Sequence, residues 1–360
     1  MERFSCRTEV VSGPGAVKVL QEYNCRRLLV ATESRLLHTD TVREIVRSAG
    51  SVETVFLTDV DAEPTMKQAV EASRRIREFS PDLMVAVGAR YVLDWGKAAA
   101  CFSKQGCILA SVPTAVGSGS EVTPWVTLTH NGRRHLLRDQ SMRPDIAILE
   151  HGLTESHRKT EVAEDGFEML AAALEAYAGM ECGFLKTIHA REAFTSGWGA
   201  LPAAVAGTTA ALRRMQIASV LTGLATADAA HGLCRAMENS LGIVFGVSRG
   251  KAAAMLLPAV IGCNAHAAGM RYAHLARAAG FGGSREEIGI RNLRTGLVRL
   301  RRELGLPGTL VQAGTDIRSV WNSGKQIVEM TLEDPACRNN PVAVDGFLVR
   351  RILEEITGQI

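Results

Sequence analysis

Short apolar runs alternate with amphipathic stretches through the first half of the chain. Aliphatic runs of five or six residues predict buried strands, and stretches with apolar residues three or four positions apart predict helices. The predicted strands are 27–32, 52–57, 83–87 and 107–112, and the predicted helices are 39–49, 65–79 and one that begins near Leu93. Regular alternation of this kind predicts a Rossmann-like α/β domain, with a parallel sheet and flanking helices, over residues 1–157.

The pattern changes after about residue 158, where strand-like runs disappear. The remaining stretches are rich in Ala and Leu and predict helices at 161–180, 187–200, 209–238 and 251–268. The sequence therefore predicts an all-α second domain over residues 158–360. We place the hinge between the two domains in the polar segment Thr154–Thr160.

Composition narrows the classes of partner. The chain has 360 residues, of which 46% are hydrophobic, and 41 Lys and Arg stand against 38 Asp and Glu, so the net charge is +3 without a long basic run. This balance argues against a nucleic-acid partner. The eight cysteines are scattered without a CxxC pair, no apolar stretch approaches twenty residues, and Met1–Cys6 lacks a signal-peptide core. We expect a cytoplasmic protein with no membrane partner.

Several motifs identify a family. Pro113–Thr123 reads PTAVGSGSEVT, Ser12–Ala16 reads SGPGA, and Asn339–Pro341 reads NNP. Together with Ala225–Arg235 and Arg249–Pro258, these segments resemble the iron-containing (group III) alcohol dehydrogenases over nearly the whole chain. The resemblance implies a dehydroquinate synthase-like architecture, an active site in the interdomain cleft, NAD(P)-dependent alcohol dehydrogenase activity and a homodimer. The run His231–Arg235 is also similar to a short motif of maleylacetate reductases.

The resemblance also locates four positions that hold the family's metal ion. An Asp and a His four residues later precede a Glu-Ala-Tyr, here Glu175–Tyr177, so these positions are Glu168 and Ala172. The other two ligand histidines correspond to Arg235 and Arg249, and a further family His corresponds to Asn239. A guanidinium stays protonated and offers no lone pair to a metal. We therefore predict that the protein has no catalytic metal.

Charge counting suggests what replaces the metal. A divalent ion with one Asp and three neutral His gives +2 − 1 = +1, and Glu168 with Arg235 and Arg249 gives −1 + 2 = +1. One interpretation is that an electropositive centre still polarises the substrate oxygen. The other is an inert salt bridge in an abandoned site.

The cofactor site is expected at the ends of the first-domain strands. Glu33 follows the first strand, where its carboxylate would accept from ribose hydroxyls and repel a 2′-phosphate, which favours NAD over NADP. The family's Gly-Gly-Gly-Ser phosphate loop reads Gly88-Ala89-Arg90-Tyr91 here. Arg90 either contacts a phosphate or marks a decayed loop. The other predicted cofactor-binding residues are Asp94, Lys97, Thr114, Gly117, Ser118 and Ser120.

Without a metal, alcohol oxidation needs a general base. His231 precedes Arg235 by four residues and would share its helix face, with Glu168 and Glu238 as alternatives. Two guanidinium groups favour a small-molecule or peptide substrate that carries a carboxylate. Oxidation of a β-hydroxy acid would also permit decarboxylation. The competing hypothesis is an inert family member that binds a nucleotide or a partner protein.

Overall fold

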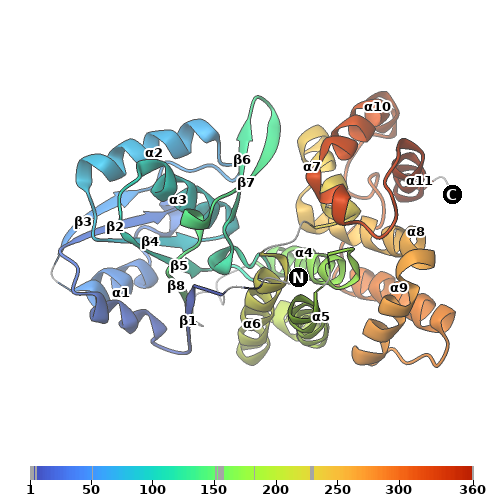
Figure 1. Ribbon diagram of the computed structural model, residues 1–360, viewed down its shortest axis with the longest axis horizontal. Coiled ribbons are helices and arrows are strands. Elements are labelled where there is room, and N and C mark those ends of the chain that lie inside the picture. The colour runs from blue at the N-terminus through green and yellow to red at the C-terminus, as the bar shows by residue number, and fades with distance from the viewer. Residues whose placement is uncertain are drawn as a thin grey trace. The chain divides into compact units, whose positions relative to one another are not determined.

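The computed structural model describes residues 4, 6–50, 52–150, 152, 158–181, 183–227 and 231–358. The chain divides into two compact units, Ser5–His157 and Arg158–Ile360 with Met1–Phe4 (Figure 1). The predicted hinge, 154–160, falls mostly outside the described residues.

The first unit is built on a six-stranded parallel sheet of order β1-β8-β5-β4-β2-β3. Its strands are β1 (Glu9–Ser12), β2 (Arg27–Thr32), β3 (Glu53–Leu57), β4 (Leu83–Gly88), β5 (Ile108–Pro113) and β8 (Ile146–Leu149). The predicted α/β class with a parallel sheet is confirmed. Pattern analysis did not predict β1, β8 or the antiparallel hairpin of β6 (Trp125–His130) and β7 (Arg133–Arg138).

Side chains alternate between the two faces of this sheet, and each face is covered by helices. Leu28 and Val30 point into one core, shared with η1 (Ala16–Tyr23) and α1 (Asp40–Ala49). Leu29 and Ala31 point into the other, shared with α2 (Met66–Phe79), α3 (Arg90–Ser103) and β6. Both faces are apolar because helices cover both, which explains why the strands read as continuous hydrophobic runs.

The strand order places a reversal of winding between β2 and β4. From β2 the chain moves outward to β3, then returns to β4 on the opposite side of β2 and continues to β5 and β8. Connections that leave two neighbouring strands in opposite directions open a crevice at the strands' carboxyl ends, which is where ligands of such folds bind. The segments that follow Thr32 and Gly88 are therefore the candidate ligand-binding segments of this unit.

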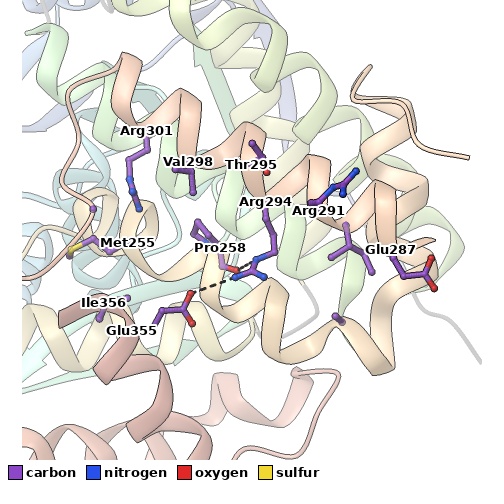
Figure 2. A pocket seen from close by; sticks show the side chains of 13 residues that line it. Met255, Pro258, Glu287, Arg291, Arg294, Thr295, Val298, Arg301, Glu355 and Ile356 are labelled. Atoms are coloured by element: carbon purple, nitrogen blue, oxygen red, sulfur yellow. Dashed lines mark hydrogen bonds and ion pairs between the residues drawn. The ribbon is translucent and has the colours of Figure 1, made fainter. Parts of the chain in front are cut away.

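The second unit is helical. Its helices are α4 (Lys159–Ala178), α5 (Phe184–Val205), α6 (Thr209–Thr226), α7 (Leu233–Phe245), α8 (Arg249–Ala278), α9 (Glu286–Glu303), α10 (Ile317–Glu333) and α11 (Gly346–Thr357). Helix α4 packs against α5, α6, α7 and α8. The predicted single helix at 209–238 is wrong, because α6 ends at Thr226 and α7 begins at Leu233. A pocket of about 650 Å³ is lined by residues of α8, α9 and α11 (Figure 2).

Helix α8 corrects one statement about hydropathy. By length and composition, Arg249–Ala278 is apolar enough to cross a membrane. The statement that no apolar stretch approaches twenty residues is therefore wrong for this helix. However, 67% of its most apolar window is buried inside the protein. It packs against α4, α7, α9 and α11, as expected of a central core helix.

Candidate functional site

The altered phosphate loop folds without backbone strain. Gly88 ends β4 with φ +158°, and a Cβ there would lie 2.7 Å from the Cβ of Val92, so this position requires glycine. Ala89 has φ −69°, and Arg90 is the first residue of α3. Arg90 has no positive φ, so the replacement of a glycine by arginine at this position costs no backbone strain. The loop still leads directly into a helix N-terminus, the feature that receives a phosphate in dinucleotide folds.

Glu33 lies immediately after β2, and both of its carboxylate oxygens accept hydrogen bonds from the protein. Arg35 donates from Nε to Oε2 at 2.5 Å and from Nη2 to Oε1 at 3.0 Å. The Tyr91 hydroxyl donates to Oε2 at 2.5 Å. Tyr91 therefore links the first turn of α3 to the end of β2, across the reversal of winding. The predicted ribose contact of Glu33 stays a prediction, and a ribose hydroxyl would have to compete with Tyr91.

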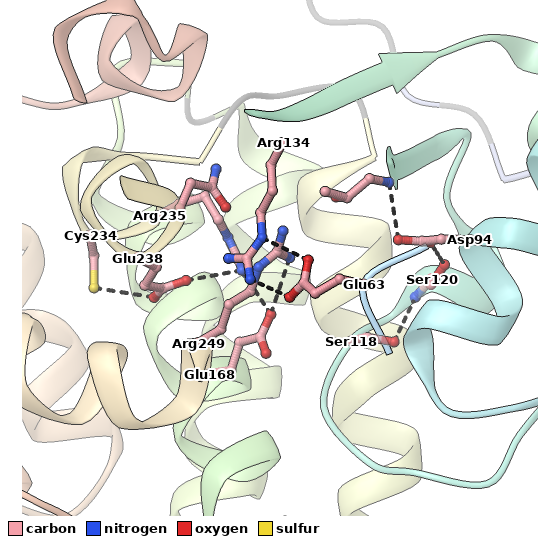
Figure 3. A network of polar contacts seen from close by, with 12 residues as sticks. Glu63, Asp94, Ser118, Ser120, Arg134, Glu168, Cys234, Arg235, Glu238 and Arg249 are labelled. Carbon is pink, nitrogen blue, oxygen red and sulfur yellow. Dashed lines mark hydrogen bonds and ion pairs between the residues drawn. The ribbon is translucent and has the colours of Figure 1, made fainter. Parts of the chain in front are cut away.

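Asp94 and Lys97 hold a loop rather than face a ligand. The fully buried Lys97 ammonium donates to Ser120 O at 2.8 Å, Ser120 Oγ at 2.8 Å and Trp125 O at 2.6 Å. Asp94 accepts from Ser120 Oγ at 2.5 Å and from Thr127 N at 3.1 Å (Figure 3). Burial lowers the pKa of Lys97 to about 8, while Asp94 opposes the shift. All three ammonium protons are used, so Lys97 positions the loop instead of contacting a cofactor.

The loop held by Lys97 has the turn that its glycines predict. Gly117 and Gly119 adopt φ +119° and +65°, and Ser118 Oγ accepts from Ser120 N at 3.2 Å. The end of β5 adds a buried hydroxyl: Thr114 Oγ1 has no hydrogen-bond partner among the described residues, and neither has Thr32 Oγ1 at the end of β2. Buried hydroxyls without partners are costly. These two lie at the carboxyl ends of strands, where a dinucleotide would supply partners, so this edge fits the cofactor.

In the second unit, the residues at the family's metal-ligand positions form a buried ion cluster (Figure 3). Arg235 Nη1, on α7, donates to Glu168 Oε1, on α4, at 2.7 Å. Arg249 is the first residue of α8, and its Nη1 lies 3.7 Å from Glu168 Oε1. The close start of α8 depends on Gly250, where a Cβ would lie 2.2 Å from the carbonyl oxygen of Glu164, one turn before Glu168. The structure thus brings together three of the predicted catalytic residues.

A fourth charge belongs to this cluster and changes its sum. Glu238 Oε2 lies 2.9 Å from Arg235 Nη1, and Glu238 is only 1% exposed. With both carboxylates ionised the count is +2 − 2 = 0, not the +1 derived from the sequence. Burial raises the pKa of Glu238, while Arg235 lowers it. When Glu238 carries a proton the count returns to +2 − 1 = +1, so its protonation state sets the charge of the cluster.

The sequence predicts Glu238 only as an alternative base. Glu238 follows Arg235 by three residues, and this spacing within a helix places both side chains on one face. The spacing was therefore the feature of the sequence that could have predicted their ion pair.

The placement of His231 corrects the predicted base. Helix α7 begins at Leu233 after an extended Gly232, so His231 precedes the helix and does not share a helical face with Arg235. The reason lies in Glu175 on α4, whose carboxylate accepts from Cys234 N at 2.7 Å and Arg235 N at 3.3 Å. Because these amides bond to a side chain, the helix starts here. Burial raises the pKa of Glu175 to about 7.

Asn239 follows Glu238 on α7 and contacts a carboxylate outside the cluster. Its Nδ2 donates to Asp334 Oδ2 at 2.8 Å, a contact that joins α7 to the segment after α10. This contact does not test whether Asn239 belongs to the catalytic set, which stays a prediction.

The residues at these positions do not fit a metal ion. Ala172 has no ligand atom, Arg235 and Arg249 present protonated groups, and Glu168 Oε1 already accepts from Arg235. Within the described ranges, no three His, Cys, Asp or Glu side chains are grouped so as to hold a metal ion. We therefore derive no step through a metal.

Comparison with known proteins places both units in one family. Residues 7–151 match the model of iron-containing alcohol dehydrogenase, and residues 162–357 match the C-terminal model of the Fe-containing alcohol dehydrogenase family. The chain is 29% identical to 1-propanol dehydrogenase PduQ of Salmonella typhimurium, over 99% of this chain and 100% of that protein. The solved 1,3-propanediol oxidoreductase superposes with a TM-score of 0.92 at 22% identity, covering 99% and 100% of the two chains. Sulfoacetaldehyde reductase from Bifidobacterium kashiwanohense, in complex with NAD+, gives 0.89 at 20% identity with full coverage of both chains.

Proposed function

We propose, from the premise that this chain belongs to the iron-containing alcohol dehydrogenase family, that it is a metal-independent, NAD-dependent oxidoreductase acting on a carboxylate-bearing hydroxy or keto substrate. Membership makes the chain an enzyme of the alcohol dehydrogenase type. The observation that carries the finer proposal is the cluster of Glu168, Arg235, Glu238 and Arg249, which stands where the family holds its metal.

The arginines support an anionic substrate. A guanidinium binds a carboxylate through two parallel hydrogen bonds, a geometry that an alcohol cannot use. Arg249 is held to Glu168 at 3.7 Å, longer than a hydrogen bond, whereas Arg235 is fixed at 2.7 Å and 2.9 Å to two carboxylates. Because Arg235 is already fixed to both carboxylates, we assign to it the positioning of Glu168 and Glu238, and we assign the substrate carboxylate to Arg249.

The first unit supplies the proposed NAD site. Gly88, the start of α3 and the Gly117–Ser120 loop form the phosphate-binding segments, and Thr32 and Thr114 offer buried hydroxyls. NAD bound by these segments would accept the hydride from the carbinol carbon. The Glu33 carboxylate disfavours a 2′-phosphate.

Glu238 is the proposed proton carrier. Burial raises the pKa of the Glu238 carboxyl group, which favours its protonated form, so this group can accept a proton from the hydroxyl during oxidation and return it during reduction. Oxidation of a β-hydroxy acid would give a β-keto acid. When the bond between its α-carbon and its carboxylate breaks, CO₂ leaves and the remaining enolate takes up a proton at the α-carbon.

The test compares two alcohols of equal chain length, 3-hydroxypropanoate and 1-propanol, with chelator-treated protein and NAD. We expect a higher kcat/KM for the hydroxy acid. Arg249→Gln should lower that value about tenfold to a hundredfold, because it removes a charge-assisted hydrogen bond worth about 1.5–3 kcal/mol. The turnover of 1-propanol should change much less. Arg47→Gln, an exposed arginine of α1, is the control. Preference for 1-propanol, or activity only with added metal, would contradict the proposal.

Two observations favour the alternative of an inert nucleotide- or partner-binding protein. Glu238 can neutralise the ion cluster, and Tyr91 with Arg35 already satisfies Glu33. Titration with NAD, followed by quenching of tryptophan fluorescence, separates the cases. Binding of NAD without turnover of either substrate would favour the inert reading, and binding with turnover would exclude it.

A further inference from the structure

The pocket of about 650 Å³ in the second unit is formed by one face each of α8 and α9 and by the end of α11 (Figure 2). Along α9 its lining residues recur at helical spacing, and along α8 they are Met255, Pro258 and Ala265. The α9 residues are Glu287, Ile290, Arg291, Arg294, Thr295, Val298 and Arg301. Its size lies in the range of small-molecule sites, roughly 300–1,000 Å³.

Two backbone carbonyls of α8, at Ala254 and Pro258, anchor two arginines of α9. Pro258 has no N–H, so the carbonyl of Ala254 loses its donor within the helix. Arg301 Nη1 donates to that carbonyl at 3.4 Å, and Arg294 Nε donates to Pro258 O at 2.8 Å. A Cβ at Gly262 would lie 3.0 Å from Arg294 Cζ, so the small residue lets the guanidinium lie against the helix. Both cations are thus fixed on the pocket wall by the backbone of α8.

Few carboxylates neutralise the positive charge of the arginines that line the pocket. Arg294 shares an ion pair with Glu355 at 3.5 Å, and within the described part of the chain Arg291 and Arg301 have no carboxylate within ion-pair distance. Arg301 Nε is buried and has no hydrogen-bond partner among the residues that the structure describes. Burial and the neighbouring Arg302 lower the pKa of Arg301, as expected of a cation without a counterion. The lining therefore carries three arginines against two glutamates beside an apolar wall.

We propose that this pocket is a second ligand site, which takes a small amphipathic anion. Its apolar body packs on Met255, Pro258 and Val298, and its phosphate or carboxylate group binds Arg301 and Arg294. A bound oxyanion would supply the negative charge that the arginine-lined wall lacks. The site is separate from the Glu168 cluster, and the proposal does not depend on the proposed reaction.

Calorimetric titration of the full chain with octyl phosphate, octanoate and 1-octanol tests the site. We expect one of the two anions to bind and the neutral alcohol to bind at least about tenfold more weakly, which corresponds to a charge-assisted hydrogen bond. Arg301→Gln should weaken the anion about tenfold or more. Arg299→Gln removes the same charge from an exposed position of α9 outside the lining and should have little effect.

The two anions distinguish a phosphate head group from a carboxylate. Thr295→Glu provides a second variant, because Thr295 is exposed and the change adds a carboxylate to the rim without disturbing a core contact. It should also weaken the anion. Failure of both anions to bind, equal binding of octanol, or undiminished binding to the Arg301 and Thr295 variants would overturn the proposal.

Discussion

Replacement of Arg235 by alanine tests whether the ion cluster is a buried unit of stability. The side chains of Arg235, Glu168 and Glu238 are only 10%, 9% and 1% exposed. Although burial lowers it, Glu238 and Glu168 raise the pKa of Arg235 above its ordinary value. Loss of one partner from a buried pair costs about 3–5 kcal/mol, because the remaining charges stay buried without compensation. In a domain of this size, that corresponds to a fall in Tm of about 6–20 °C.

The sign of the pH dependence follows from the carboxylates that remain. Without Arg235 the folded-state pKa of Glu238 rises further above its unfolded value. The stability that protonated Glu238 contributes is then complete below the unfolded pKa and is lost as the pH rises through the folded pKa. The deficit of Arg235→Ala should therefore be largest at about pH 8 and smaller at about pH 5.

Thermal melts of three variants decide the matter. Arg47→Ala breaks an exposed ion pair of 2.6 Å, close in length to the 2.7 Å pair of Arg235 with Glu168, and should cost less than about 1 kcal/mol. The double variant Arg235→Met with Glu238→Gln removes one positive and one negative charge together, and it should recover most of the Tm that Arg235→Ala loses. If Arg235→Ala melts like wild type at about pH 8, or the double variant melts no better than the single one, the reasoning about the buried cluster fails.

Three further expectations follow from the site. The purified protein should contain no stoichiometric iron or zinc and should keep its activity after chelation; elemental analysis showing about one metal per chain would contradict this. NAD should bind more tightly than NADP, and Glu33→Ala should narrow the gap in a fluorescence titration; a wild-type preference for NADP would mean that Glu33 does not face the ribose. Burial raises the pKa of Glu175 from 4.5 to about 7, so the stability contributed by its protonated form is lost as the pH rises through that range. The Tm of Glu175→Gln relative to wild type should therefore be higher at about pH 8 than at about pH 5, and equal differences would count against this account.

The central strands of the sheet could be predicted because their signal is local. The run Arg27–Thr32 is β2 residue for residue, and the next strand differs by a single residue. The hairpin of β6 and β7 was missed because its exposed strand, RRHLLR, carries mostly charged and polar residues. Its partner β6 contributes Val126 and Leu128 to a core that helices α2 and α3 complete. The sequence pattern of such a strand does not predict it, because its pairing depends on contacts with the neighbouring strand and helices.

The break between α6 and α7 could not be predicted because its cause is remote. Alanine-rich sequence continues through residue 230 and favours an unbroken helix. The observed start of α7 depends on Glu175, whose carboxylate binds amides 59 and 60 residues later in the chain. In the same way, Tyr91 reaches Glu33 across 58 residues. Local periodicity contains no information on either contact.

The charge of the ion cluster depends both on residue types, which the sequence gives, and on the position of Glu238, which only the structure gives. The residue types at the metal-ligand positions predict a cluster charge of +1. The structure adds Glu238 beside Arg235, so the charge is +1 only while Glu238 is protonated. A metal ion keeps its charge at every pH, whereas this cluster loses its net positive charge when Glu238 ionises. If the cluster polarises a substrate oxygen, it does so only while Glu238 is protonated, and reduction of a keto group then uses that same proton. An arrangement of this kind couples the charge that stabilises the reacting oxygen to the proton that the reaction consumes.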